Sequence, residues 1–257
     1  MPAQLLSTRH GETMVLTLHN PDNRNALGPE IYAAGIEALN SAGADIRSVV
    51  IVGQGNTFCA GGNLERLKAN RERPPEVQAQ SIEGLHLWIE ELRAFPRPVI
   101  AAVEGAAAGA GFSLALACDF IVAARDAFFV MSYSSVALSP DGGGSWHLPR
   151  LLPRPLVNEL LMLGTRIEAE RLHALGAVNQ LATPGSALTE AMALADRLNR
   201  RAPNALASIK ELVNKAPHTE LPGHLAAERD RFVRNLHHPN AGVGIEAFLT
   251  KTTPRYA

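Results

Sequence analysis

Two segments of this chain join an apolar, strand-like run to a glycine-rich turn that leads into a helix-like run. One turn covers residues 53–62, after the β-branched run 48–52, and the other covers residues 104–111, after the apolar run 98–103. Glycine lets a ligand approach the backbone closely, and the first N–H groups of a helix lack an intrahelical acceptor. Two such turns facing each other could stabilise a developing oxyanion; each turn alone could equally serve only tight packing.

A third segment, residues 139–149, places a carboxylate directly before three glycines. Asp141 precedes Gly142–Gly144 at a turn before a helical run, so we expect it near the N-terminus of a helix. An aspartate on such an accessible backbone could act as a general acid or base. The alternative is an aspartate that only caps the helix or closes an Asx turn.

Other catalytic motifs are missing or incomplete. A dinucleotide-binding G-x-G-x-x-G is not met, because Leu114 follows Gly109 and Gly111 where the third glycine would stand, and there is no P-loop sequence. The nucleophile elbow G-x-S-x-G around Ser113 ends in Ala115 and falls inside a helix-like run, which disfavours a serine hydrolase. No histidine or cysteine spacing suits zinc, so we expect no metal site.

Alternating strands and helices must position these groups over about the first 185 residues. Their periodicity predicts strands at 14–18, 48–52, 98–103 and 120–123, and helices at 29–39, 76–94 and 110–118. After about residue 186 the pattern is helical only, with predicted helices at 187–199, 204–213, 221–236 and 244–250. Asn204 follows a proline and is the predicted N-cap of its helix.

Composition limits the class of protein. The 257 residues suit one sizeable domain, or one domain with an appendage. Lys+Arg is 24 and Asp+Glu is 25, for a net charge of −1, which argues against nucleic acid or a membrane surface as a partner. Cys59 and Cys118 alone make no disulfide framework, and the first ten residues lack a signal-peptide pattern. We therefore expect a cytoplasmic protein.

Residues 98–118 could imitate a membrane span, since the run has about the right length and carries Gly105 and Gly109 at GxxxG spacing. Glu104 and the break between a strand-type and a helix-type pattern argue against that interpretation. A buried strand, a glycine turn and a buried helix explain the run better.

These segments together resemble the crotonase, or enoyl-CoA hydratase/isomerase, superfamily. Residues 20–27 match its R-N-A-L element, residues 57–64 its F-x-A-G-x-D-L element, and residues 97–119 its second signature. The resemblance runs from about Leu16 to Arg255 and implies an α/β fold, the ClpP/crotonase spiral of ββα units. It also implies a core over residues 1–190, a helical oligomerisation region over 191–257, and a homotrimer or dimer of trimers.

The substrate implied by this resemblance is an acyl-CoA thioester, with coenzyme A as part of the substrate and no tightly bound cofactor. The thioester carbonyl would accept hydrogen bonds from the N–H groups of Gly62 and Ala110, the second of which is usually glycine in the family. Arg24 would meet the CoA phosphates. The positions that match CoA-contacting residues are Arg24, Ala26, Ala60, Gly62, Asn63, Leu64, Phe232, Phe248 and Lys251, the last three often reaching across a subunit boundary. Solvated charges and core aromatics are the alternative for Arg24 and these three.

The departures from the family concern the reaction itself. The two glutamates of family hydratases map to Ser113 and Tyr133, neither of which readily takes a proton from water. Asp141 matches the acidic residue of family isomerases, including the ring-epoxide-opening group, while Tyr133 and Trp146 would shape the acyl pocket. The resemblance thus favours an isomerase over a hydratase, a CoA-thioester or oxepin hydrolase, or a non-catalytic acyl-CoA-binding protein.

Overall fold

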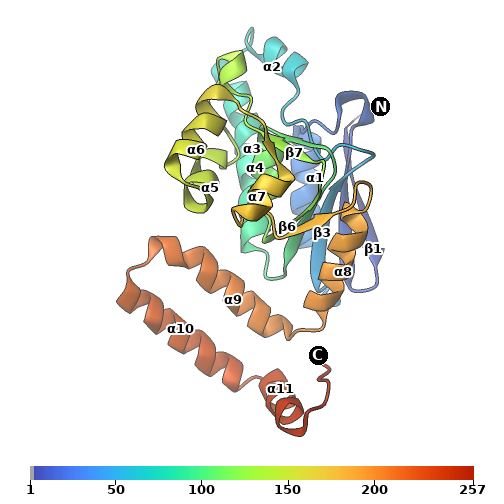
Figure 1. Cartoon of the computed structure of the whole chain (residues 1–257), viewed down its shortest axis with the longest axis vertical. Helices are drawn as coiled ribbons and strands as arrows, with labels where there is room; N and C mark the ends of the chain where they lie inside the picture. Colours follow the sequence, from blue (N-terminus) through green and yellow to red (C-terminus); the bar gives the residue numbers. More distant parts are fainter. Residues whose placement is uncertain (1–2) are drawn as a thin grey trace.

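A six-stranded sheet forms the centre of the computed structural model, which describes residues 3–257 (Figure 1). Its strand order is β1-β2-β3-β4-β6-β9, and only the pairing of β1 with β2 is antiparallel. Within the described residues, β5, β7 and β8 form a second, three-stranded sheet. The strands are β1 Gln4–His10, β2 Thr13–His19, β3 Ser48–Gly53, β4 Val99–Val103, β5 Ala106–Ala108, β6 Phe120–Ala124, β7 Phe128–Val130, β8 Ile167–Glu168 and β9 Gln180–Ala182.

Helices cover both faces of the large sheet. Val49 and Ile51 of β3 pack in the main core with α1 and α3, whereas Val50 and Val52 face α8. Burial on both faces explains why β3 is a continuous β-branched run rather than an alternating one. The helices of the core are α1 Pro29–Asn40, α2 Leu64–Asn70, α3 Pro75–Ala94, α4 Ala110–Ala117, α5 Gly144–Leu151, α6 Arg154–Asn158, α7 Ala169–Ala174 and α8 Ala187–Asn199.

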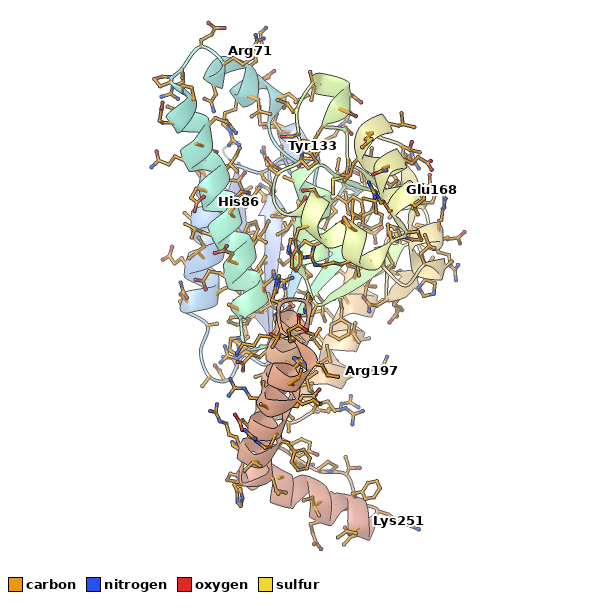
Figure 2. All side chains as sticks on the ribbon, turned by 90° about the vertical axis from the view of Figure 1, so that its left-hand side faces the viewer. Arg71, His86, Tyr133, Glu168, Arg197 and Lys251 are labelled. Carbon is orange, nitrogen blue, oxygen red and sulfur yellow. The ribbon has the colours of Figure 1, made fainter. Side chains whose placement is uncertain are left out.

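A helical tail projects from this core (Figures 1 and 2). It consists of α9 Pro203–Lys215, α10 Leu221–Leu236 and α11 Pro239–Thr250. Its attachment is polar: Lys210 of α9 donates to Asp119 at 2.7 Å and to the Leu92 carbonyl at 2.9 Å. Arg93 and Asn214 exchange further hydrogen bonds between α3 and α9.

All the strands and helices predicted from periodicity are present, with ends shifted by a few residues. Two details of the predicted helices differ, and several elements, among them β1, β7 and α7, were not predicted. Asn204 does not cap α9, because Ala202 holds that position and the Asn204 side chain donates to Asn235. The last helix begins at Pro239, since the His238 ring accepts the Asn240 N–H at its start. Edge strand β1 escaped prediction because its mostly exposed residues show no apolar period.

The expected boundary between residues 190 and 191 falls inside α8. Ala187, Ala191 and Ala195 of this helix are all buried against the sheet, so the projecting part of the chain begins with α9. Residues 1 and 2, which belong to the expected core and to the segment lacking a signal-peptide pattern, lie outside the described residues. Over the described residues, no helix combines the length and apolarity needed to cross a membrane, and residues 98–118 form β4, β5 and α4.

Candidate active site

The two glycine-rich turns lie side by side, as the pairing of their strands requires. The Cys59 N–H donates to the Ala106 carbonyl at 3.0 Å, and the Ala108 N–H donates to the Cys59 carbonyl at 2.8 Å. Gly61 has a φ of +87°, and a Cβ there would lie 2.6 Å from the Ala108 oxygen. Only glycine therefore allows the first turn to approach the second this closely. Burial raises the pKa of the Cys59 thiol to about 12, so it remains a neutral core side chain.

Two backbone N–H groups are available where the turns meet. Ala110 is the first residue of α4, so its N–H precedes the intrahelical hydrogen bonds. Within residues 3–257, the N–H groups of Gly62 and Ala110 donate to no other protein group. Both residues line the same cavity. Both N–H groups are therefore available to hydrogen-bond a ligand in this cavity.

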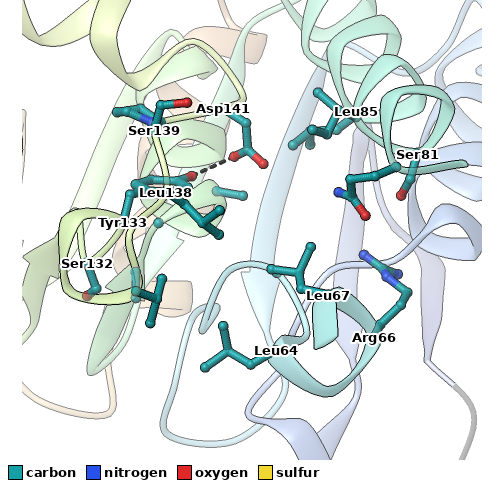
Figure 3. Close-up of a pocket in the computed structure, with 18 of the residues that line it drawn as sticks. Leu64, Arg66, Leu67, Ser81, Leu85, Ser132, Tyr133, Leu138, Ser139 and Asp141 are labelled. Carbon is teal, nitrogen blue, oxygen red and sulfur yellow. Dashed lines mark hydrogen bonds between the residues drawn. The ribbon is translucent and has the colours of Figure 1, made fainter. Parts of the chain in front are cut away.

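That cavity has a volume of about 470 Å³ and lies between α2, α3 and the segment 132–141 (Figure 3). Much of its wall is aliphatic, formed by Leu64, Leu67, Ile82, Leu85, Val136 and Leu138. A concave, largely apolar pocket with a few polar groups is typical of a small-molecule site.

Asp141 lies on the cavity wall, three residues before α5, as its place in the sequence predicts. Tyr133 donates its phenolic O–H to Oδ1 of Asp141 at 2.5 Å, drawn as the dashed line in Figure 3. Ser113 donates its hydroxyl to the backbone carbonyl of Asp141 at 3.0 Å. Oδ2 of Asp141 accepts no hydrogen bond from the described residues, so this oxygen can act on a ligand.

The protonation state of Tyr133 favours its role as a donor. Burial raises the pKa of the phenol well above its ordinary value of 10.0, and the charge and hydrogen bond of Asp141 raise it further. Tyr133 therefore keeps its proton at any physiological pH and holds the Asp141 carboxylate in place. Ser113 is fully buried inside α4, away from any strand-to-helix elbow, which fits neither a nucleophile nor an open pocket wall.

The predicted CoA-contacting residues of the core fall into two groups. Ala60 and Leu64 line the cavity with Gly62. Ala26 and Arg24 are not part of the cavity wall. Ala26 is buried, and Arg24 is exposed in a left-handed turn with a φ of 50°.

Asn63 has a structural contact that its motif did not predict. Its Oδ1 accepts the Arg66 N–H at 2.9 Å and thereby caps α2. The side chain therefore helps to position the helix that forms one wall of the cavity.

The predicted CoA contacts in the tail are not brought to this cavity within one chain. Phe232 is 70% exposed and Phe248 is 85% exposed, so neither is a core aromatic. Figure 2 shows Lys251 near the far end of the tail from Tyr133.

Trp146 does not shape the cavity that holds Asp141. It lines a second cavity, together with Arg93 and His147, next to α9. The guanidinium groups of Arg93 and Arg150 lie 4.7 and 3.8 Å from the centre of its ring system. The packing of α5 directs Trp146 away from Asp141 and toward Arg93 of α3 and His218 of the tail.

Sequence reasoning missed the polar residues Arg66, Gln78 and Ser81, which also line the cavity with Asp141. The predicted helix 76–94 contains Gln78 and Ser81, three residues apart and hence on one face. That spacing was the available signal, but an exposed polar face has the same pattern. Within the described residues, no three His, Cys, Asp or Glu side chains are grouped to hold a metal ion.

Comparison with known proteins shows the family of this chain. The family model for enoyl-CoA hydratase/isomerase matches residues 8–257. A 1,2-epoxyphenylacetyl-CoA isomerase of Escherichia coli (strain K12) is 34% identical, with 98% of this chain and 97% of that protein covered. A carnitinyl-CoA dehydratase of Citrobacter koseri is also 34% identical, covering 99% and 98%.

A solved structure is still more similar. A crystal structure described as an enoyl-CoA hydratase from Polaromonas sp. JS666 is 68% identical, covers 99% of this chain and 100% of its own, and superposes with a TM-score of 0.98. The chain is thus an enzyme of the crotonase superfamily, with the α/β fold expected for it. It belongs to the enoyl-CoA hydratase/isomerase family, whose members act on acyl-CoA thioesters.

Proposed function

We propose that this protein isomerises an acyl-CoA thioester, with Asp141 as the group that moves the proton. The observation that carries this proposal concerns Ser113 and Tyr133, the two positions that match the glutamates of family hydratases. Ser113 and Tyr133 both donate hydrogen bonds to Asp141, one to its backbone and one to its carboxylate. Both positions support a single carboxylate instead of supplying two of their own.

The reaction follows from this arrangement. The thioester oxygen accepts hydrogen bonds from the N–H groups of Gly62 and Ala110. Oδ2 of Asp141 takes a proton from the carbon beside the thioester carbonyl, and the two N–H groups stabilise the resulting enolate oxygen. Asp141 then returns the proton to a different carbon, so the product has the same atoms as the substrate.

The acyl group is proposed from the named relatives. The Escherichia coli relative is named for a ring epoxide of phenylacetyl-CoA, which makes opening of such a ring our first choice of substrate, with a simple enoyl-CoA as the next. The 68% identical structure is described as a hydratase, and this favours hydration as the second candidate. A thioester hydrolase would need Asp141 to activate a water molecule. A non-catalytic binding protein would have no use for Asp141.

The proposed assembly is a homotrimer or a dimer of trimers. The tail exposes large apolar side chains that a monomer leaves in water, including Val213, Leu221, Phe232, Phe248 and Leu249. In such an assembly, Phe232, Phe248 and Lys251 of one copy would contact the CoA bound to a neighbour, next to Arg24. We propose the reducing cytoplasm as its location, since Cys59 and Cys118 are free thiols.

The test compares the wild type with Asp141→Asn on crotonyl-CoA, 3-enoyl-CoA and the ring epoxide of phenylacetyl-CoA. We expect products of unchanged mass, and a fall in kcat of about 10²–10⁴-fold in the variant. Asp126→Asn, at an exposed aspartate, is the control. Products heavier by one water would identify a hydratase, release of free CoA a hydrolase, and binding without turnover a non-catalytic protein.

A further inference from the structure

One side of the cavity carries polar side chains for which the proposed reaction has no use. Arg66 of α2 and Ser81 of α3 lie across the cavity from Asp141 and Tyr133, as Figure 3 shows. Leu67 and Leu85 lie between the two sides. A ligand that fills this cavity therefore meets the oxyanion donors and Asp141 at one end, an aliphatic middle, and a polar far end.

Arg66 brings a positive charge to that far end. Its Nε is buried and has no hydrogen-bond partner among the described residues, while another part of the guanidinium hydrogen-bonds to the buried phenol of Tyr32. Glu30 of α1 approaches the same place, since a Cβ on Gly28 would lie 2.8 Å from Nη1 of Arg66 and 3.0 Å from Oε2 of Glu30. The absence of a side chain on Gly28 leaves the guanidinium room beside the buried ring of Tyr32.

The neighbours of Arg66 on this wall are also hydrogen-bond donors. Asn70 donates to Oε1 of Gln78 at 2.7 Å, which fixes the amide and leaves its NH₂ group as the free donor. Ser81 adds a hydroxyl from the next turn of α3. A guanidinium, an amide NH₂ and a hydroxyl on one wall match a ligand group that accepts several hydrogen bonds and carries negative charge.

We propose that this far end binds a carboxylate at the distal end of the acyl group, so that the preferred substrates are CoA thioesters of acids with a second acidic group. The inference rests on the proposed function, which places the thioester at Gly62 and Ala110. A guanidinium pairs with a carboxylate through parallel, charge-assisted hydrogen bonds, and the Arg66 side chain lines the cavity where such a carboxylate would lie. The aliphatic middle then accommodates the methylene groups between the two ends.

The test measures binding of unreactive thioesters, so it does not depend on which reaction Asp141 performs. Matched pairs differ only in a terminal carboxylate or methyl group: succinyl- and butyryl-CoA, glutaryl- and valeryl-CoA, adipoyl- and hexanoyl-CoA. For at least one length we expect the wild type to prefer the carboxylate. Arg66→Met should reduce the ratio of the two Kd values by about tenfold or more, since a charge-assisted pair is lost. Arg71→Met, at an exposed arginine that follows α2, should leave the ratio unchanged.

Each other outcome has one meaning. Equal affinity for both members of every pair, or a preference for the methyl member, would overturn the inference while the proposed function stands. Equal weakening of both members by Arg66→Met would assign Arg66 to the CoA moiety and would also overturn it. A wild type that binds none of these thioesters would contradict the proposed function itself.

Discussion

Tyr133 and Asp141 are joined by a hydrogen bond of 2.5 Å between the phenolic O–H and Oδ1 of the carboxylate. Tyr133 is also close to the turn that supplies an oxyanion donor, since a Cβ on Gly109 would lie 3.5 Å from its ring. The tyrosine thus connects the candidate proton-transfer group with the candidate oxyanion site.

Tyr133→Phe should lower kcat by about 10- to 100-fold and leave the Kd for a CoA thioester nearly unchanged, because only a hydrogen bond to a charged group is lost. The measurement is a double-mutant cycle with Asp141→Asn. We expect Tyr133→Phe to have little further effect in the Asp141→Asn background. Additive effects would mean that the tyrosine acts independently of Asp141. Tyr256→Phe, in the C-terminal segment, is the matched control.

Ala110→Pro should remove one oxyanion donor without breaking α4. Ala110 is the first residue of the helix, where proline is tolerated because the N–H has no intrahelical acceptor. We expect kcat to fall by about 10²–10³-fold. Ala110→Gly keeps the N–H and should stay within a few-fold of the wild type. The measurement is the steady-state rate of each variant, with melting temperatures recorded to confirm that both are folded. Equal rates for the two variants would mean that the Ala110 N–H has no part in catalysis.

Lys210→Met should destabilise the protein by about 3 kcal/mol, because it leaves the Asp119 carboxylate without its cation. Burial raises the pKa of Asp119, and the charge of Lys210 opposes that rise. The melting temperature at a fixed protein concentration measures the loss. Adding Asp119→Asn should recover part of it.

The control for this prediction is Lys215→Met, five residues along the same helix. It breaks an exposed pair with Glu211 and should cost less than about 1 kcal/mol. Similar losses in the two lysine variants would mean that the Asp119–Lys210 pair has no special part in attaching the tail.

His147 should make the protein less stable in acid. Burial lowers its pKa from 6.5 to about 4, and the charges of Arg93 and Arg150 lower it further. The unfolded chain therefore takes up the proton first as the pH falls, and stability should decrease from about pH 6.5 down to about pH 4, by at most about 3 kcal/mol. The free energy of unfolding, measured across this pH range, should change less with pH in His147→Gln than in the wild type. An unchanged pH dependence in that variant would assign the acid sensitivity to other groups.

Much of the fold was predictable because its signals are local. The β-branched run of β3 and the period of α3 reflect burial that neighbouring residues report together. The glycine turns were predictable for the same reason, since a position with a left-handed φ, such as that of Gly61, favours glycine over other residue types. The position of Asp141 before a helix was predictable from the three glycines that follow it. Trp146 was misplaced because helical direction depends on how α5 packs, and periodicity over eight residues does not report that.

By itself the sequence determined the family, the two glycine-rich turns, and the candidate acid Asp141, since each depends on residues close together in the chain. Only the tertiary structure decided that Ser113 and Tyr133 both bond to Asp141, and that Arg66 faces the same cavity. Ser113 reaches Asp141 from α4, 28 residues away in the chain, and Arg66 faces the cavity from α2; Tyr133 is only eight residues from Asp141, but a loop of irregular shape brings the two together. Their partners are chosen by the pairing of strands and the packing of helices, so neither residue type nor spacing reports them.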